Sequence, residues 1–364
     1  MADPALQRAL LKSLLSLPNP LLRAAGGGGV VWRAGRTLDP RFQFLWKSWR
    51  KPRSLSDLSP EEARTAWAEM VRTTGARARK AVQVETLLLE GPAGPMTTRL
   101  YRPRGQDPDA PMLVFFHDGA GVVGDLDTCE GLCAELAEVA RCPVLTPAYR
   151  LAPEHRFPAG LDDALAAWRW AESNAPRYGA TGAAVGGQSI GAAFAAAICQ
   201  TLRDEGARQP VLQLLICPLL DAASDAQSLE TFADAWPLSR EALRWALAQY
   251  IGPEDDPTDP RLSPLRARSV AGLAPAIIVT AGFDPLVDQG EQYARKLRAV
   301  KVPTVYRCYE RLPNAFPAFA GVAPTAAVAT CEIAGLLREG FEGRVAASAD
   351  IVDREEGEHA GLVI

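Results

Sequence analysis

Short apolar runs alternate with helical segments along most of this 364-residue chain, and this alternation restricts the fold more than any other feature. After Lys80 helical periodicity gives way to strand-like runs, of which the most apolar are MLVFFH (112–117), CPVLTP (142–147) and PAIIVTA (275–281). The stretches between successive strand-like runs include helical segments near 128–140, 160–173, 190–203 and 286–299. Apolar strands joined through helices pair in parallel and are covered on both faces. The sequence therefore predicts an α/β fold with a mostly parallel sheet.

Two parts of the chain lie outside this alternation. Residues 1–80 are largely helical and rich in Trp and Arg, and residues 222–265 form a polar, helical insert. We expect both to cap the carboxyl ends of the strands, above a core made of residues 81–221 and 266–345. The remaining residues, 346–364, are acidic and aperiodic, which predicts a frayed tail.

A candidate nucleophile lies between a strand and a helix. The strand-like AAVGG leads into Gly187-Gln188-Ser189-Ile190-Gly191, and an Ala-rich helical segment follows at once. This is the G-x-S-x-G pattern in the strand–turn–helix setting that gives it meaning. The serine of such a turn projects at a helix N-terminus, where free N–H groups favour developing negative charge.

Several further segments carry a family resemblance. They are FFHDGAG (115–121), YRLAPEHRFPA (149–159), GFDPLVD (282–288) and YERLPNAFPAFAGVAP (309–324). Together with the turn around Ser189, known as a nucleophile elbow, they resemble the hormone-sensitive-lipase-like family of α/β-hydrolases, the bacterial carboxylesterases with an HGGG loop. The resemblance runs from about residue 35 to residue 340. The resemblance implies an α/β-hydrolase fold, with a mostly parallel eight-stranded sheet, helices on both faces and a helical cap.

The resemblance also assigns roles to residues that match the family's motifs. Ser189 matches the nucleophile, and Asp284 matches the acid that orients the catalytic histidine. The backbone amides of Gly119, Ala120 and Ile190 match the oxyanion hole. The matches of His117 and His155 are structural: the first braces the oxyanion loop and the second begins a helix.

One catalytic position departs from the family. Its histidine belongs to a His-Gly-Phe segment, and here that segment is Asn314-Ala315-Phe316. Serine is a weak nucleophile until a neighbouring base takes its proton, and the same base later protonates the leaving alcohol. The amide of asparagine does not titrate, so Asn314 can do neither. The only other histidine, His359, lies in the predicted tail.

Further departures surround this one. Asp118 replaces a loop glycine, and Gln188 and Ile190 replace the usual Asp and Ala beside the serine. A carboxylate next to an oxyanion site opposes ester hydrolysis unless it points away or is protonated. Several changes together favour a site that diverged or was repurposed over a single engineered substitution.

Three functions remain open at this point. The first is an esterase-type enzyme whose capped pocket takes a small apolar, ester-like substrate, with ordinary hydrolysis weak or absent. The second is a non-hydrolytic enzyme, a cyclase, dehydratase or lyase, in which a desolvated Asp118 is the acid or base. The third is a ligand-binding pseudoenzyme. Phe316 and Trp236 are candidate substrate contacts, although core packing is the favoured explanation for Phe316 and packing between cap helices explains Trp236 equally well.

Composition excludes other classes. The net charge of −4 gives no electrostatic reason to expect a nucleic acid or an anionic membrane as partner. No apolar run is long enough for a membrane span, and the N-terminus lacks the basic start of a signal peptide. The odd number of scattered cysteines, seven, favours the cytoplasm over a disulfide-forming compartment. No motif implies a metal or an organic cofactor. The leucine-rich segment 3–17 is expected to dock on its own protein or on a second copy, so a homodimer stays open.

Overall fold

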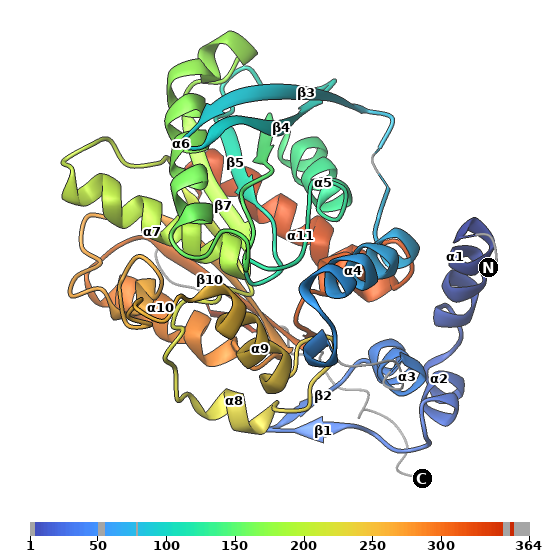
Figure 1. Ribbon diagram of the computed structural model, residues 1–364. Coiled ribbons are helices and arrows are strands. Elements are labelled where there is room, and N and C mark those ends of the chain that lie inside the picture. The colour runs from blue at the N-terminus through green and yellow to red at the C-terminus, as the bar shows by residue number, and fades with distance from the viewer. Residues whose placement is uncertain (1–3, 50–54, 78, 345–349, 353–364) are drawn as a thin grey trace.

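The architecture is that of a single large sheet between two layers of helices, seen in the computed structural model (Figure 1). The structure describes residues 4–49, 55–77, 79–344 and 350–352. The strands of the large sheet are β3 (Val82–Gly91), β4 (Gly94–Pro103), β5 (Met112–Phe116), β6 (Val144–Pro147), β7 (Ala183–Gln188), β8 (Gln213–Ile216), β9 (Ala276–Phe283), β10 (Thr304–Pro313) and β11 (Asp350–Val352). Their order across the sheet is β11-β10-β9-β8-β7-β5-β6-β4-β3.

Strands β5 to β10 pair in parallel, whereas β4 runs antiparallel to both β6 and β3. Every residue of β5, β7 and β9 is buried, as expected for central strands covered on both faces. The predicted α/β-hydrolase fold is thus confirmed in its eight main strands. One expectation was wrong: residues 350–352 of the predicted tail form a ninth strand, paired in parallel with β10.

Helices cover both faces of the sheet. On one face α5 (Glu130–Ala140) packs against α11 (Pro324–Phe341). The other face carries α6 (Ala159–Asn174), α7 (Ile190–Asp204) and α10 (Val287–Ala299) (Figure 1). None of the helices in the described ranges is long and apolar enough to cross a membrane.

The remaining elements belong to the N-terminal region and the insert. They are α1 (Pro4–Leu15), α2 (Asn19–Ala25), α3 (Pro40–Trp49), α4 (Pro60–Thr74), α8 (Gln227–Thr231) and α9 (Arg240–Tyr250), with the small hairpin β1 (Trp32–Arg33) and β2 (Arg36–Thr37). Short 3₁₀ turns lie at Leu55–Asp57, Ala175–Tyr178, Pro264–Arg266 and Phe316–Phe319.

Two of these helices lie against the loop that follows β5. Arg64 of α4 donates to the carbonyl oxygens of Val122 and Ala152, at 2.8 and 2.7 Å. From α9, the ring of Tyr250 lies so close to Gly121 that a Cβ there would come within 2.5 Å of it. The N-terminal region and the insert therefore both meet the carboxyl end of β5, where the sequence places the candidate site.

Candidate active site

Ser189 occupies a strained turn between β7 and α7. Its φ of 56° and ψ of −117° lie outside the regions that non-glycine residues ordinarily adopt. Two contacts hold it there: the Ser189 amide donates to the carbonyl of Ile216, and the Leu219 amide donates to the carbonyl of Ser189, at 2.9 and 3.2 Å. The hydroxyl-bearing residue therefore sits at the start of α7, as the motif predicts.

The glycines that flank Ser189 are required by close backbone contacts. A Cβ on Gly187 would lie 2.2 Å from the carbonyl carbon of Gly191. A Cβ on Gly191 would lie 2.2 Å from the carbonyl oxygen of Phe116 and 2.6 Å from that of His117. Glycine thus lets the elbow touch both its own helix and the end of β5.

The loop after β5 presents free amides beside this elbow. Gly119 and Ala120 have positive φ values of 114° and 52°. Among the hydrogen bonds of the described ranges, the amides of Gly119, Ala120 and Ile190 donate to no acceptor. Three such donors at the end of β5 and the start of α7 are the kind of group that binds an oxyanion.

His117 is built into the base of this loop. Its ring stacks on Tyr149 with centroids 4.1 Å apart, and its Nδ1 lies 2.7 Å from the Asp118 carbonyl oxygen and 3.0 Å from the Tyr149 hydroxyl. Burial lowers the pKa of His117 to about 4, so the ring is neutral at pH 7. This packing suits a brace. His155 is exposed in the turn before α6, and His359 lies outside the described residues.

Asp284 and Asn314 meet at the ends of two neighbouring strands, β9 and β10. Nδ2 of Asn314 donates to Oδ2 of Asp284 at 2.9 Å, and the Leu286 amide donates to Oδ1 at 2.8 Å. Both side chains are buried. Ala315, which follows Asn314, has a φ of 56° in the left-handed region. The contact that would orient an imidazole therefore orients an amide instead.

Cys217 is a neighbour of Asp284 that sequence reasoning missed. Its thiol lies near the Asp284 carboxyl and acts to lower the pKa of that group, and the backbone of Cys217 has a φ of 43°. The thiol is fully buried, and burial raises its pKa well above the usual value. No motif marks this residue, because its place beside Asp284 arises only where β8 and β9 end together.

The Asp284 carboxyl is itself unusual, because burial raises its pKa to about 7 in spite of the hydrogen bonds from Leu286 and Asn314. Raising the pKa of a carboxyl on folding favours the folded state at low pH, and that advantage is lost as pH rises through about 7. We expect the contribution of this carboxyl to the free energy of unfolding to fall by a few kcal/mol between about pH 4 and pH 7. The size follows from the shift of its pKa on folding, because each pKa unit corresponds to about 1.4 kcal/mol.

This pH dependence is measured by urea unfolding of the wild type and of Asp284→Asn across that range. Because the asparagine does not titrate, the stability difference between the two proteins should change with pH in favour of the variant as pH rises. A difference that is constant from pH 4 to pH 8 would contradict a raised pKa at Asp284.

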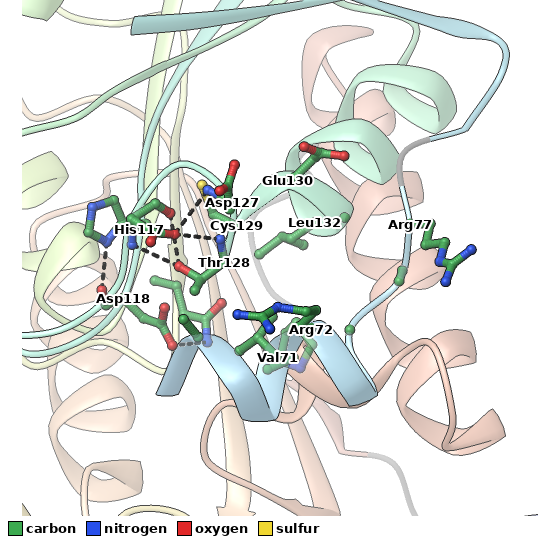
Figure 2. Close-up of a pocket in the computed structure, with 18 of the residues that line it drawn as sticks. Val71, Arg72, Arg77, His117, Asp118, Asp127, Thr128, Cys129, Glu130 and Leu132 are labelled. Atoms are coloured by element: carbon green, nitrogen blue, oxygen red, sulfur yellow. Dashed lines mark hydrogen bonds between the residues drawn. The ribbon is translucent and has the colours of Figure 1, made fainter. Parts of the chain in front are cut away.

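Asp118 lines a cavity of about 460 Å³ (Figure 2). Its Oδ2 accepts a hydrogen bond from Nε2 of Gln188 at 3.3 Å, so two residues that depart from the family contact each other. Burial raises the pKa of Asp118 to about 7. α4, the loop before α5 and the start of α5 supply most of the wall. Ser189, Asp284 and Asn314 do not line this cavity.

The two predicted substrate contacts pack on other aromatic rings. Phe316 has no exposed surface and lies edge-on against Tyr309, with centroids 5.3 Å apart. Trp236, in the insert, is half-buried against Phe319 at 5.2 Å. Phe316 is thus a core residue in this structure, and a role in binding stays a prediction for both residues.

Comparison with known proteins gives a consistent picture. An alpha/beta hydrolase fold family model matches residues 113–318. The carboxylic ester hydrolase LipN of Mycobacterium tuberculosis is 38% identical over 339 residues, which are 90% of each chain. Ethyl acetate hydrolase of Pseudomonas putida is 37% identical over 251 residues, covering 67% of this chain and 79% of that protein.

Solved structures agree. A mutant of LAE6, an alpha/beta hydrolase enzyme from the metagenome of Lake Arreo, superposes with a TM-score of 0.77 at 35% identity, covering 81% of this chain and 94% of the other. The esterase of Pyrobaculum calidifontis gives 0.73 at 29% identity, covering 80% and 96%. The fold, the matched family model and the extent of these similarities show that this chain belongs to the hormone-sensitive-lipase-like family of α/β-hydrolases.

Proposed function

We propose that this protein binds a small, apolar, ester-like molecule in an esterase-type capped site and hydrolyses ordinary esters weakly or not at all. The hydrogen bond from Asn314 to Asp284 carries this proposal. In a working triad the acid holds an imidazole that takes the serine proton and returns it to the leaving alcohol. Here the partner of the acid is an amide, which does not accept a proton at neutral pH.

Other parts of an ester-binding site support the proposal. The strained Ser189, the free amides of Gly119, Ala120 and Ile190, and the two capping regions are features that position an acyl group. Relatives named as a carboxylic ester hydrolase and an ethyl acetate hydrolase point to small esters as the substrate class. The cysteines are free thiols and six of them are buried, so we propose the reducing cytoplasm as the compartment of this protein.

The missing base predicts a specific substrate order. An alkoxide leaving group needs a proton, whereas a nitrophenolate leaves without one. We expect residual turnover of p-nitrophenyl acetate and no measurable hydrolysis of ethyl acetate, because only the aryl ester departs without an acid. The release of nitrophenolate and of acetic acid measures the two rates.

Ser189→Ala is the control for this order, since it removes the nucleophile and leaves the free amides in place. Its p-nitrophenyl acetate rate should fall toward that of buffer. Hydrolysis of ethyl acetate at a rate typical of esterases, abolished by Ser189→Ala, would overturn the proposal.

A second function is favoured by Asp118: proton abstraction next to a carbonyl, the first step of many dehydratase and lyase reactions. A carboxyl with a pKa of about 7 is half ionised at neutral pH, and this one lines a cavity. Its carboxylate would take the α-proton of a bound carbonyl compound. The C–H electrons would move into the carbonyl, which gives an enolate.

Proton exchange separates the candidate functions. If Asp118 is a base, the α-hydrogens of methyl acetoacetate should exchange with D₂O faster with the wild type and with Ser189→Ala than with Asp118→Asn, as followed by ¹H NMR. Equal exchange for all three proteins would remove this function. Binding of the same compound without exchange or hydrolysis would identify a ligand-binding pseudoenzyme.

A further inference from the structure

The N-terminal segment has a charge opposite to that of the whole protein. Residues 4–38 contain five Lys or Arg and no Asp or Glu, whereas the whole chain has a net charge of −4. The five cations are Arg8, Lys12, Arg23, Arg33 and Arg36. The net charge of the whole chain does not describe this segment, so we consider what the segment could bind from its own positive charge.

The same segment leaves large apolar side chains in contact with solvent. Leu6 and Leu10 of α1 are 55% and 63% exposed, Leu17 after α1 is 36% exposed, and Leu21 of α2 is 55% exposed. We call these four residues the N-terminal leucine face. Trp32 of β1, in the same cationic segment, is 65% exposed. Helices α1 and α2 lie at the edge of the molecule, away from the large sheet (Figure 1).

The opposite side of these helices is already used. Leu15 and Leu22 are fully buried, and Nε of Arg8 donates to the carbonyl of Thr73 at the end of α4, at 3.1 Å. Arg8 also donates to the carbonyls of Arg72 and Gly75. The expected docking of this segment on its own protein is therefore made through these groups. The N-terminal leucine face takes no part in this docking and stays exposed to solvent.

The charge of the segment distinguishes two possible partners of the N-terminal leucine face, a second copy of the chain and a lipid surface. Within the described residues, Lys12 and Arg23 have no acidic partner, whereas Arg33 pairs with Asp234. A two-fold contact through this face would bring the cations of both copies into one interface, and residues 4–38 offer no acidic side chain to balance them. An anionic membrane surface offers apolar acyl chains to the leucines and negative headgroups to Lys12 and Arg23.

We propose that the N-terminal leucine face, in a segment that also carries the cations Lys12 and Arg23, docks the protein on an anionic lipid surface. Exposed leucines with an exposed tryptophan and flanking cations are the composition of interfacial segments. The docking is peripheral, and it does not depend on the proposed catalytic function, so Ser189→Ala should bind lipid as the wild type does.

The test is co-sedimentation of the full chain with sucrose-loaded vesicles at low salt. One set contains phosphatidylcholine alone, and the other contains phosphatidylcholine with three-tenths phosphatidylglycerol. We expect binding to the phosphatidylglycerol vesicles that weakens as salt is added, and little binding to phosphatidylcholine. Lys12→Gln with Arg23→Gln should weaken it about 25-fold, at about fivefold for each cation removed. Arg208→Gln with Lys301→Gln, which removes exposed cations elsewhere, should leave it unchanged.

The apolar contribution is tested by Leu6→Asp with Leu10→Asp, which should abolish sedimentation with the vesicles. Leu88→Asp is the matched control, because Leu88 of β3 is 73% exposed and lies outside the segment. No binding by the wild type, or equal binding to both vesicle types, overturns the proposal. A dimer in light scattering that the Leu6 and Leu10 changes convert to a monomer would assign the face to a second copy, and also overturns it.

Discussion

Asn314→His is expected to raise the turnover of p-nitrophenyl acetate by about 10²- to 10⁴-fold, the usual contribution of a positioned general base. Nδ2 of Asn314 already donates to Asp284 at 2.9 Å, and an imidazole Nδ1–H can make the same hydrogen bond. We expect the other ring nitrogen to take the proton of Ser189, as the histidine of a triad does. Hydrolysis of ethyl acetate should appear as well, because imidazolium can protonate the leaving alkoxide.

The rate gained by this variant should depend on pH. Histidine accepts a proton only when it is neutral, so the gain should disappear as pH falls below about 6. The rate is measured from pH 5 to pH 9, with Asn314→Gln as a control that keeps an amide and adds length. Asn314→His combined with Ser189→Ala should return to the background rate.

An absence of any gain would mean that the rest of the site no longer supports hydrolysis. Asp118 and Ile190 are the residues to change next, since Asp118 directly precedes the first of the free amides in the chain and Ile190 adds bulk after the nucleophile. A gain that persists when Ser189 is also removed would contradict the assignment of Ser189 as nucleophile.

Gly191→Ala is expected to destabilise the protein by about 3 kcal/mol or more, at the upper end of what overpacking costs. The added Cβ would lie 2.2 Å from the carbonyl oxygen of Phe116. Backbone atoms on both sides of this contact leave no flexible side chain to move aside. Relief requires that α7 move away from the end of β5, which also displaces the free amides of the loop.

Urea unfolding measures this loss, with Gly335→Ala as the matched control. Gly335 lies within α11, and a Cβ there would meet nothing within 4 Å. Alanine is the better helix former, so the control should be stabilised by about 0.5–1 kcal/mol. A Gly191→Ala protein as stable as the wild type would show that the elbow and β5 can separate freely.

Most of the fold could be predicted from local patterns. The apolar runs at 112–117, 142–147 and 275–281 become β5, β6 and β9, because a strand buried on both faces needs an unbroken apolar sequence. The ninth strand could not be predicted, since residues 350–352 gain their pairing from β10, more than 40 positions earlier in the chain. The short hairpin of β1 and β2 likewise lies in a stretch whose pattern indicated helix.

The residues of the candidate site also fall into two groups: those that local motifs locate and those that only tertiary contacts bring together. The residues around Ser189 and Asp284 could be located because their motifs specify a turn and a strand end, which are local features. The hydrogen bond between Gln188 and Asp118, and the thiol of Cys217 beside Asp284, join residues from different strand ends. No periodicity in the sequence indicates contacts of this kind.

By itself, the sequence determined the order of strands and helices, the glycine-flanked serine, and the presence of an amide at Asn314, because these depend on residue type and on neighbours along the chain. Only the tertiary structure decided that Asp118 and Asp284 have pKa values near 7 and that Leu6 and Leu10 face solvent. Ionisation and exposure both depend on how far surrounding groups exclude water, and those groups come from distant parts of the chain.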